Sequence, residues 1–217
     1  RHADLLMDTY LVVKLPKIWS PILKYINLDG TFEYRPYEFQ WIKNIGSQLI
    51  EEVRFTMNGS EIQKYSGAYI QNVVERDFDY NKKEFFNKMI GNIPELYDPA
   101  NYANRNNNYP NAFKPDDNDI SNIMHSIDEY TLYIPLNSWF SLVPSMAVPL
   151  ICLQYTEFRI EFKLRPINQL FTIKDVKYDT STNPLNIDYF NYDNIPRIKP
   201  DSSIAPEYEL YRFIQQP

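Results

Sequence analysis

The chain has 217 residues, and its formal net charge of -6 argues against a nucleic-acid surface, which normally needs a basic face. This length predicts one large domain or at most two small ones, with enough chain to bury a core. A single cysteine, Cys152, excludes an internal disulfide framework and a multi-thiolate metal site.

The first third of the chain predicts two strand regions. Residues 4–15 are mostly apolar and predict a largely buried strand that ends at Pro16. In residues 48–64, apolar and polar side chains alternate on either side of Asn58-Gly59. Asn-Gly favours a type I′ turn, in which both central residues take positive φ, so this stretch predicts a β-hairpin.

Two short helices and a long loop are expected next. Apolar residues recur at helical spacing in residues 67–78 and 82–90, and Gly91 is well placed to end the second helix. Residues 98–122 are rich in Asn and Pro, residues that favour turns, and predict a long exposed loop.

Strand character returns in the second half of the chain. Residues 129–136 predict one strand, and residues 157–165 give the clearest alternation in the sequence. Its apolar members would share one sheet face and pack against a second sheet: Phe158, Ile160, Phe162 and Leu164. Further strands are expected near 170–178, 185–190 and 208–215, which makes the chain one β-rich domain with two short helices.

The sequence offers little for catalysis or metal binding. Its two histidines, His2 and His125, are far apart and have no ligand spacing, so His125 is interpreted as a solvated loop residue. An acidic run formed by Asp116, Asp117 and Asp119 lacks a regular calcium-loop motif and is interpreted as a solvated turn. We therefore expect no enzyme activity, no catalytic or metal-binding residues and no cofactor.

Two surface features remain open to more than one interpretation. Asn58-Gly59-Ser60 is formally an N-glycosylation acceptor, although turn chemistry explains Asn58 as well. The long loop also carries aromatic residues that could stack on a sugar or be buried against another subunit: Tyr97, Tyr102, Tyr109 and Phe113. Composition does not decide between a carbohydrate-binding module and a subunit interface.

Five segments, in order, resemble the major capsid proteins of nucleocytoplasmic large DNA viruses. The most specific is residues 134–155, IPLNSWFSLVPSMAVPLICLQY, which resembles the strand–turn–strand hallmark of that family. The other four are DLL through LP in residues 4–16, NGSEI in 58–62, NKMIGN in 87–92 and PEYEL in 206–210. The family pattern differs in detail, with Gly usual where Ala3 stands and a His and an Ile that are missing from the last segment.

This resemblance implies an all-β fold, a jelly-roll β-sandwich of two packed antiparallel sheets, as the first of two tandem jelly rolls. Residues 1–217 would form a single jelly-roll domain without its first strand, with long exposed loops at about 98–122 and 178–206. We accordingly expect the chain to be part of a longer protein.

The resemblance also implies a structural role. Three copies would form a pseudo-hexagonal capsomer of an icosahedral shell, contacting neighbouring capsomers and minor capsid and penton proteins. The family implies assembly in the host cytoplasm, a place in the virion shell, an internal membrane nearby without insertion, and no direct contact with nucleic acid. The alternative is a carbohydrate-binding jelly-roll module that uses Tyr102 and Tyr109.

Overall fold

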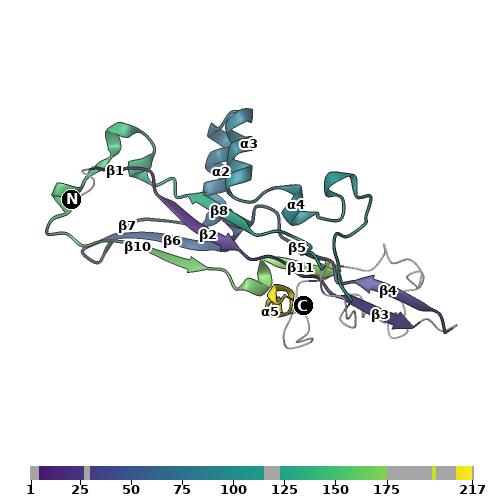
Figure 1. Cartoon of the computed structure of the whole chain (residues 1–217). Coiled ribbons are helices and arrows are strands. Elements are labelled where there is room, and N and C mark those ends of the chain that lie inside the picture. The colour runs from purple at the N-terminus through teal and green to yellow at the C-terminus, as the bar shows by residue number, and fades with distance from the viewer. Residues whose placement is uncertain (1–4, 27–29, 115–122, 175–196, 199–208, 217) are drawn as a thin grey trace, which may run out of the picture. The chain divides into compact units, whose positions relative to one another are not determined.

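The computed structural model describes residues 5–26, 30–114, 123–174, 197–198 and 209–216 (Figure 1). The chain divides into two compact units. The first comprises Arg1–Leu15, Lys43–Ile93 and Thr131–Pro166, and the second comprises Pro16–Ile42, Pro94–Tyr130 and Ile167–Pro217. Because each unit is assembled from three separate segments, long-range contacts hold each of them together.

The first unit is organised around a three-stranded antiparallel sheet. Its order is β10 (Phe158–Leu164), β6 (Ile50–Met57) and β7 (Ser60–Tyr65), so β6 is the central strand. Asn58 and Gly59 join β6 to β7 with φ of 49° and 81°. The two positive φ angles confirm the predicted hairpin and the reason for its Asn-Gly turn.

The core of this unit forms around the β6 residue Phe55, which has no exposed surface. Four aromatic rings lie with centroids between 5.7 and 6.2 Å from that of Phe55: Tyr65, Trp139, Phe140 and Phe158. Rings at these separations attract one another in edge-on and tilted arrangements. The cluster therefore joins the hairpin, β10 and residues 139–140 into one core.

The expectation that the apolar face of β10 is buried along its whole length is wrong. Phe158 and Ile160 are half-buried, but Phe162 and Leu164 are 37% and 48% exposed. Trp139 covers only the first end of the strand, where its ring lies 6.1 Å from Phe158. The alternation thus predicts correctly that these side chains share one face of the strand. It does not show whether another layer of the protein covers that face.

Two helices follow the hairpin as predicted, and they lie side by side in Figure 1. They are α2 (Gly67–Asp77) and α3 (Tyr80–Met89), with the short α1 (Ile45–Leu49) preceding β6. Asp79 caps α3 by accepting a hydrogen bond of 2.8 Å from the Lys82 backbone N–H. Gly91, with φ of 74°, follows its C-cap residue Ile90, as the sequence predicts.

The remaining strands of the first unit form two small antiparallel pairs. β2 (Tyr10–Leu15) pairs with β8 (Tyr130–Pro135), and β1 (Leu5–Leu6) pairs with β9 (Val148–Pro149). The predicted strand 129–136 is confirmed, whereas the strand predicted over 4–15 is divided in two. It is also less buried than expected, because exposed and half-buried side chains alternate along β2 until Leu15.

Short 3-10 turns occupy the region where the hallmark segment predicted a second strand. They are η3 (Trp139–Ser141), η4 (Pro144–Met146) and η5 (Leu150–Leu153), with the two-residue β9 between the last two. Pro144 and Pro149 lack the N–H that a continuous strand ladder needs, which accounts for the interruption.

The second unit contains a hairpin, a three-stranded sheet and short helical segments. β3 (Ile22–Ile26) pairs with β4 (Phe32–Pro36), and the sheet has the order β12 (Arg197–Ile198), β11 (Phe171–Lys174), β5 (Phe39–Trp41). The helical segments are α4 (Pro94–Tyr97), η1 (Tyr102–Asn104), η6 (Ile167–Gln169) and α5 (Leu210–Ile214). The ladders of both units are antiparallel, which confirms the all-β, antiparallel class.

Residues 208–215 were expected to form a strand, and that prediction is wrong. The described part of this stretch forms α5, whose Phe213 is fully buried. The Phe213 ring lies 5.3 Å from that of Phe39, which also stacks on Phe171 at 4.8 Å. The packing of Phe213 against this aromatic core, rather than the strand propensity of the segment, decides the local structure.

The structure describes residues 98–114 of the Asn-rich stretch. Four asparagines adopt positive φ, a conformation that Asn tolerates well: Asn104, Asn106, Asn107 and Asn111. Residues 115–122, the predicted strand 185–190 and nearly all of the predicted loop 178–206 lie outside the described residues. Among the helices of the described part of the chain, none is long and apolar enough to cross a membrane.

Close packing of α2 against α1 leads to a testable prediction at Gly67. A Cβ atom added there would overlap the carbonyl oxygen of Ser47, a backbone atom that cannot rotate away. We expect Gly67→Ala to lower the free energy of unfolding by about 3 kcal/mol, measured by urea denaturation.

The neighbouring Ser66→Ala is the matched control, because the Ser66 side chain is exposed and makes no capping hydrogen bond. Its effect should stay within about 0.5 kcal/mol. Equal stabilities of the two variants would contradict the close packing of Gly67 against the Ser47 carbonyl oxygen.

Candidate functional site

A long segment of the first unit lacks charged side chains. No Asp, Glu, Lys or Arg occurs between Glu129 and Glu157, and we refer to residues 131–156 as the uncharged segment. It includes most of β8, the turns η3 to η5 and β9. Because Lys, Arg, Asp and Glu are mostly found at protein surfaces, an exposed stretch of this length without them is notable.

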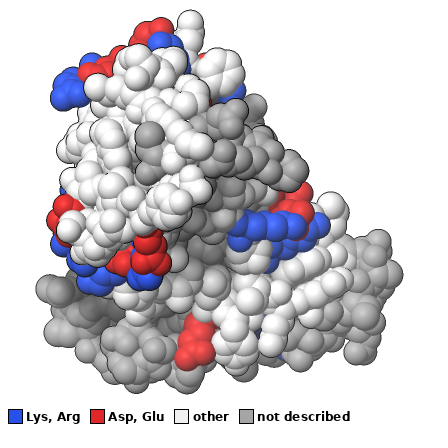
Figure 2. Space-filling view, turned by 90° about the vertical axis from the view of Figure 1, so that its left-hand side faces the viewer, with Lys and Arg blue, Asp and Glu red and all other residues white. Residues whose placement is uncertain are grey.

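Much of the uncharged segment is exposed. Large apolar or aromatic side chains with at least 45% of their surface accessible occur along it: Tyr133, Leu142, Val143, Met146, Ile151 and Tyr155. Leu5, which pairs with Pro149 across β1 and β9, adds another. Figure 2 views the side on which β1 lies in Figure 1, and a broad white area there separates charged groups above from charged groups below. An exposed apolar surface rimmed by charge is typical of a protein-binding face.

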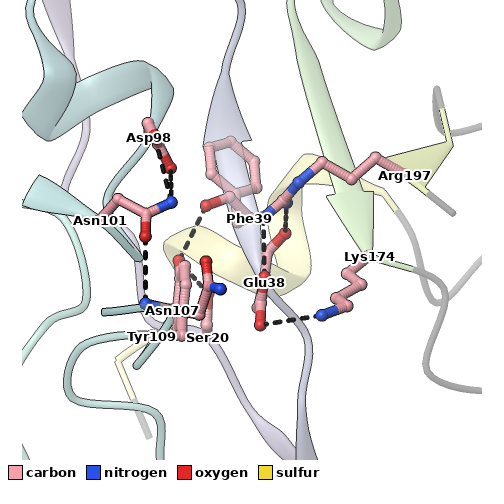
Figure 3. Close-up of polar contacts among 9 residues, drawn as sticks. All are labelled: Ser20, Glu38, Phe39, Asp98, Asn101, Asn107, Tyr109, Lys174 and Arg197. Carbon is pink, nitrogen blue, oxygen red and sulfur yellow. Dashed lines mark hydrogen bonds and ion pairs between the residues drawn. The ribbon is translucent and has the colours of Figure 1, made fainter. Parts of the chain in front are cut away.

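The second unit contains a different feature, a buried ion cluster centred on Glu38 (Figure 3). The Glu38 side chain is only 4% exposed, and its Oε2 accepts a hydrogen bond of 2.7 Å from Arg197 Nη2. Arg197 Nη1 also donates to the Glu38 backbone oxygen at 3.0 Å, and Lys174 Nζ lies 3.5 Å from Oε1. Two cations from β11 and β12 thus compensate one buried carboxylate at the start of β5.

A hydrogen-bonded loop faces this cluster across a polar cavity. Asn101 Nδ2 donates to Asp98 Oδ1 at 3.0 Å, and Asn101 Oδ1 accepts from the Asn107 backbone N–H at 3.1 Å (Figure 3). The cavity has a volume of about 300 Å³. Of the residues that the structure describes, those that line it are Glu38, Asp98, Ala100, Asn101, Asn107, Lys174 and Arg197.

Tyr109 does not have the exposed, sugar-stacking position that the sequence allowed. Its side chain is buried, and its hydroxyl donates to the Phe39 carbonyl oxygen and accepts from Ser20 Oγ, both at 2.9 Å. Burial raises the pKa of the Tyr109 hydroxyl above its ordinary value, so the group stays protonated. Tyr102 is exposed, with the Arg105 guanidinium 5.7 Å from its ring centre. The two tyrosines therefore do not form a common stacking surface.

The structure also places the other residues singled out in the sequence. His125 packs edge-on against Trp19 and lies 3.4 Å from Asp128, while Asp116, Asp117 and Asp119 fall outside the described residues. In the described part of the chain, no group of three His, Cys, Asp or Glu residues could hold a metal ion. Asn58 Oδ1 accepts from the Glu157 N–H at 2.9 Å, which ties the hairpin turn to the residue before β10, and its glycosylation stays a prediction.

The Glu38 cluster was missed by sequence reasoning. Its three members are distant in the chain, and each one alone resembles an ordinary surface charge. Only the antiparallel pairing of β11 with both β5 and β12 brings them together. The uncharged segment, in contrast, is visible in the sequence as a gap between Glu129 and Glu157.

Comparison with known proteins assigns the chain to a family. Residues 1–212 match the profile described as the major capsid protein N-terminus. The chain belongs to this family. It therefore corresponds to the N-terminal part of a major capsid protein of the nucleocytoplasmic large DNA viruses.

Individual relatives agree with this assignment. Capsid protein 1 of Acanthamoeba polyphaga mimivirus is 29% identical over 196 residues, which cover 88% of this chain and 29% of that protein. The major capsid protein of Frog virus 3 (isolate Goorha) is 25% identical over 174 residues, 80% of this chain and 33% of that protein. The chain thus spans only about a third of the length of these relatives.

A solved structure supports the fold. The Faustovirus major capsid protein matches with a TM-score of 0.52 at 11% identity, over 80% of this chain and 40% of that one. This likeness agrees with the capsid-type all-β fold that the resemblance implied.

The burial of Glu38 gives a prediction about stability. Glu38→Ala would leave Lys174 and Arg197 without their carboxylate in a site where Lys174 is only 9% exposed. We expect the free energy of unfolding to fall by about 3 kcal/mol, measured by chemical denaturation.

Glu84→Ala provides the control, because it removes an exposed ion pair with Lys88. Its effect should be no more than about 0.5 kcal/mol. If Glu38→Ala were equally mild, the buried cluster would not be a structural element.

Proposed function

We propose that the chain is part of a structural subunit in the shell of a large DNA virus and has no catalytic role. The observation that carries this proposal is the family match over residues 1–212. Relatives named as major capsid proteins from several viruses support it, among them those of Phaeocystis pouchetii virus and Frog virus 3.

The proposed architecture follows from the family and from chain length. The chain would supply the first of two tandem jelly rolls, since the relatives are about three times longer than the part it matches. Three such subunits would form a capsomer that contacts neighbouring capsomers and minor capsid and penton proteins. The site of action would be the virion, after assembly in the host cytoplasm beside an internal membrane.

The uncharged segment is the part of this chain best suited to contact another capsid subunit. It exposes apolar side chains such as Leu142 and Ile151 on short turns, and contains no charge that would have to be desolvated. Protein interfaces are similarly depleted of charge at their centres. We therefore assign the contact between subunits to this segment.

A matched pair of isoleucine variants tests this assignment. Ile151 in the uncharged segment and Ile62 in β7 are 57% and 45% exposed, and replacing either with Glu adds the same charge. In the protein with its natural flanking sequence, we expect Ile151→Glu to weaken association at least about ten-fold, because it buries an unpaired carboxylate. Light scattering on a sizing column would measure the native mass.

The Ile62→Glu variant should assemble like the unmodified protein. Normal assembly of Ile151→Glu would place the contact elsewhere. A wild-type protein that stays monomeric at all concentrations would refute the structural role itself.

A further inference from the structure

The polar cavity beside Glu38 has no part in the proposed contact between subunits. The described residues that line it all belong to the second unit, and Ala100 is the one apolar residue among them. A volume of about 300 Å³ lies at the lower end of the range for small-molecule sites. The cavity is therefore large enough for one small polar molecule.

Among the described residues of this lining, opposite charges balance. Glu38 and Asp98 supply two carboxylates, and Lys174 and Arg197 supply two cations. An anion entering the cavity would meet both carboxylates, and a cation would meet both basic groups. The charge balance therefore selects against ions of either sign and favours a neutral ligand.

The lining offers hydrogen-bond donors and acceptors in close alternation. Arg197 and the side-chain amides of Asn101 and Asn107 can donate, while Asp98 and the amide oxygens can accept. A hydroxyl group both donates and accepts, so a molecule with several hydroxyls suits such a lining better than one with a single kind of polar group.

Both walls of the cavity are already fixed. Glu38 holds Arg197 through two hydrogen bonds, and Asn101 connects Asp98 to the Asn107 backbone. Figure 3 shows the bonds of Asn101 on the left and those between Glu38 and Arg197 on the right. Prior fixing of polar groups reduces the entropy lost when a ligand binds.

We infer that this cavity binds a neutral polyhydroxyl ligand, a single sugar residue or a small polyol. Recognition by the described residues uses hydrogen bonds alone, because none of those that line the cavity carries an aromatic ring on which a sugar could stack. Binding is consequently weak, in the millimolar range, unless the sugar belongs to a larger molecule that makes further contacts. The inference does not rest on the proposed capsid function.

Ligand-observed NMR on the protein with its natural flanking sequence tests the inference. The probes are glucose, galactose, mannose and glycerol as neutral polyols, with inorganic phosphate as an anionic competitor and methylammonium as a cationic one. We expect saturable binding of at least one neutral polyol and none of phosphate or methylammonium at the same concentration. Binding of phosphate or methylammonium, or of no probe, would overturn the inference.

Two neighbouring asparagines provide a matched pair of variants. Asn106 and Asn107 are both exposed and have φ of 49° and 63°, but only Asn107 lines the cavity. Asn107→Gly removes the side-chain amide, suits the positive φ and keeps the backbone N–H that Asn101 accepts.

We expect Asn107→Gly to weaken polyol binding about five-fold, the effect of losing one hydrogen bond, and Asn106→Gly to leave it unchanged. Equal binding by the wild type and both variants would place the ligand elsewhere. Because neither residue lies in the uncharged segment, assembly measured on the same samples separates a failure of this inference from a failure of the proposed function.

Discussion

The first unit depends on the burial of Phe55 at the centre of β6. This strand pairs with β7 on one side and β10 on the other, and its aromatic ring contacts rings from three separate parts of the chain. Trp139 and Phe140 reach Phe55 from the start of the turns η3 to η5, so the same core that closes the sheet also anchors the uncharged segment. The core contacts fix the start of these turns, and apolar residues such as Ile151 are exposed farther along them.

Local signals in the sequence predicted the elements whose structure is decided locally. The Asn58-Gly59 turn, the helices ending near Asp77 and Met89, and the strand at 158–164 follow from turn chemistry, helical spacing and alternation. Predictions failed where distant packing decides the outcome. Residues 210–214 form a helix because Phe213 enters the Phe39 cluster, and the exposure of Leu164 depends on a covering layer that the alternation of β10 does not encode.

The two candidate sites differ in whether their residues lie close together in the sequence. The uncharged segment is continuous in the sequence, so the absence of charge could be found before its exposure was known. Strand pairing across more than half of the chain brings together Glu38, Lys174 and Arg197. A single sequence does not indicate which distant strands pair. Tyr109 illustrates the opposite error, because an aromatic residue in an Asn-rich loop suggested exposure, whereas its hydroxyl bonds place the ring in the core.

A contact face without charge affects how copies of an acidic chain can associate. The formal charge of -6 on each copy of this part of the protein contributes a repulsion between copies, which physiological salt screens beyond about 8 Å. An interface rich in ion pairs would be weakened by the same salt, whereas an apolar one is not. Without charged groups to fix how two copies align, however, their complementary shapes must determine their relative orientation. The short turns held by Pro144, Pro149 and the aromatic core have a fixed shape of that kind, so the internal packing of this unit would determine the geometry of the proposed contact.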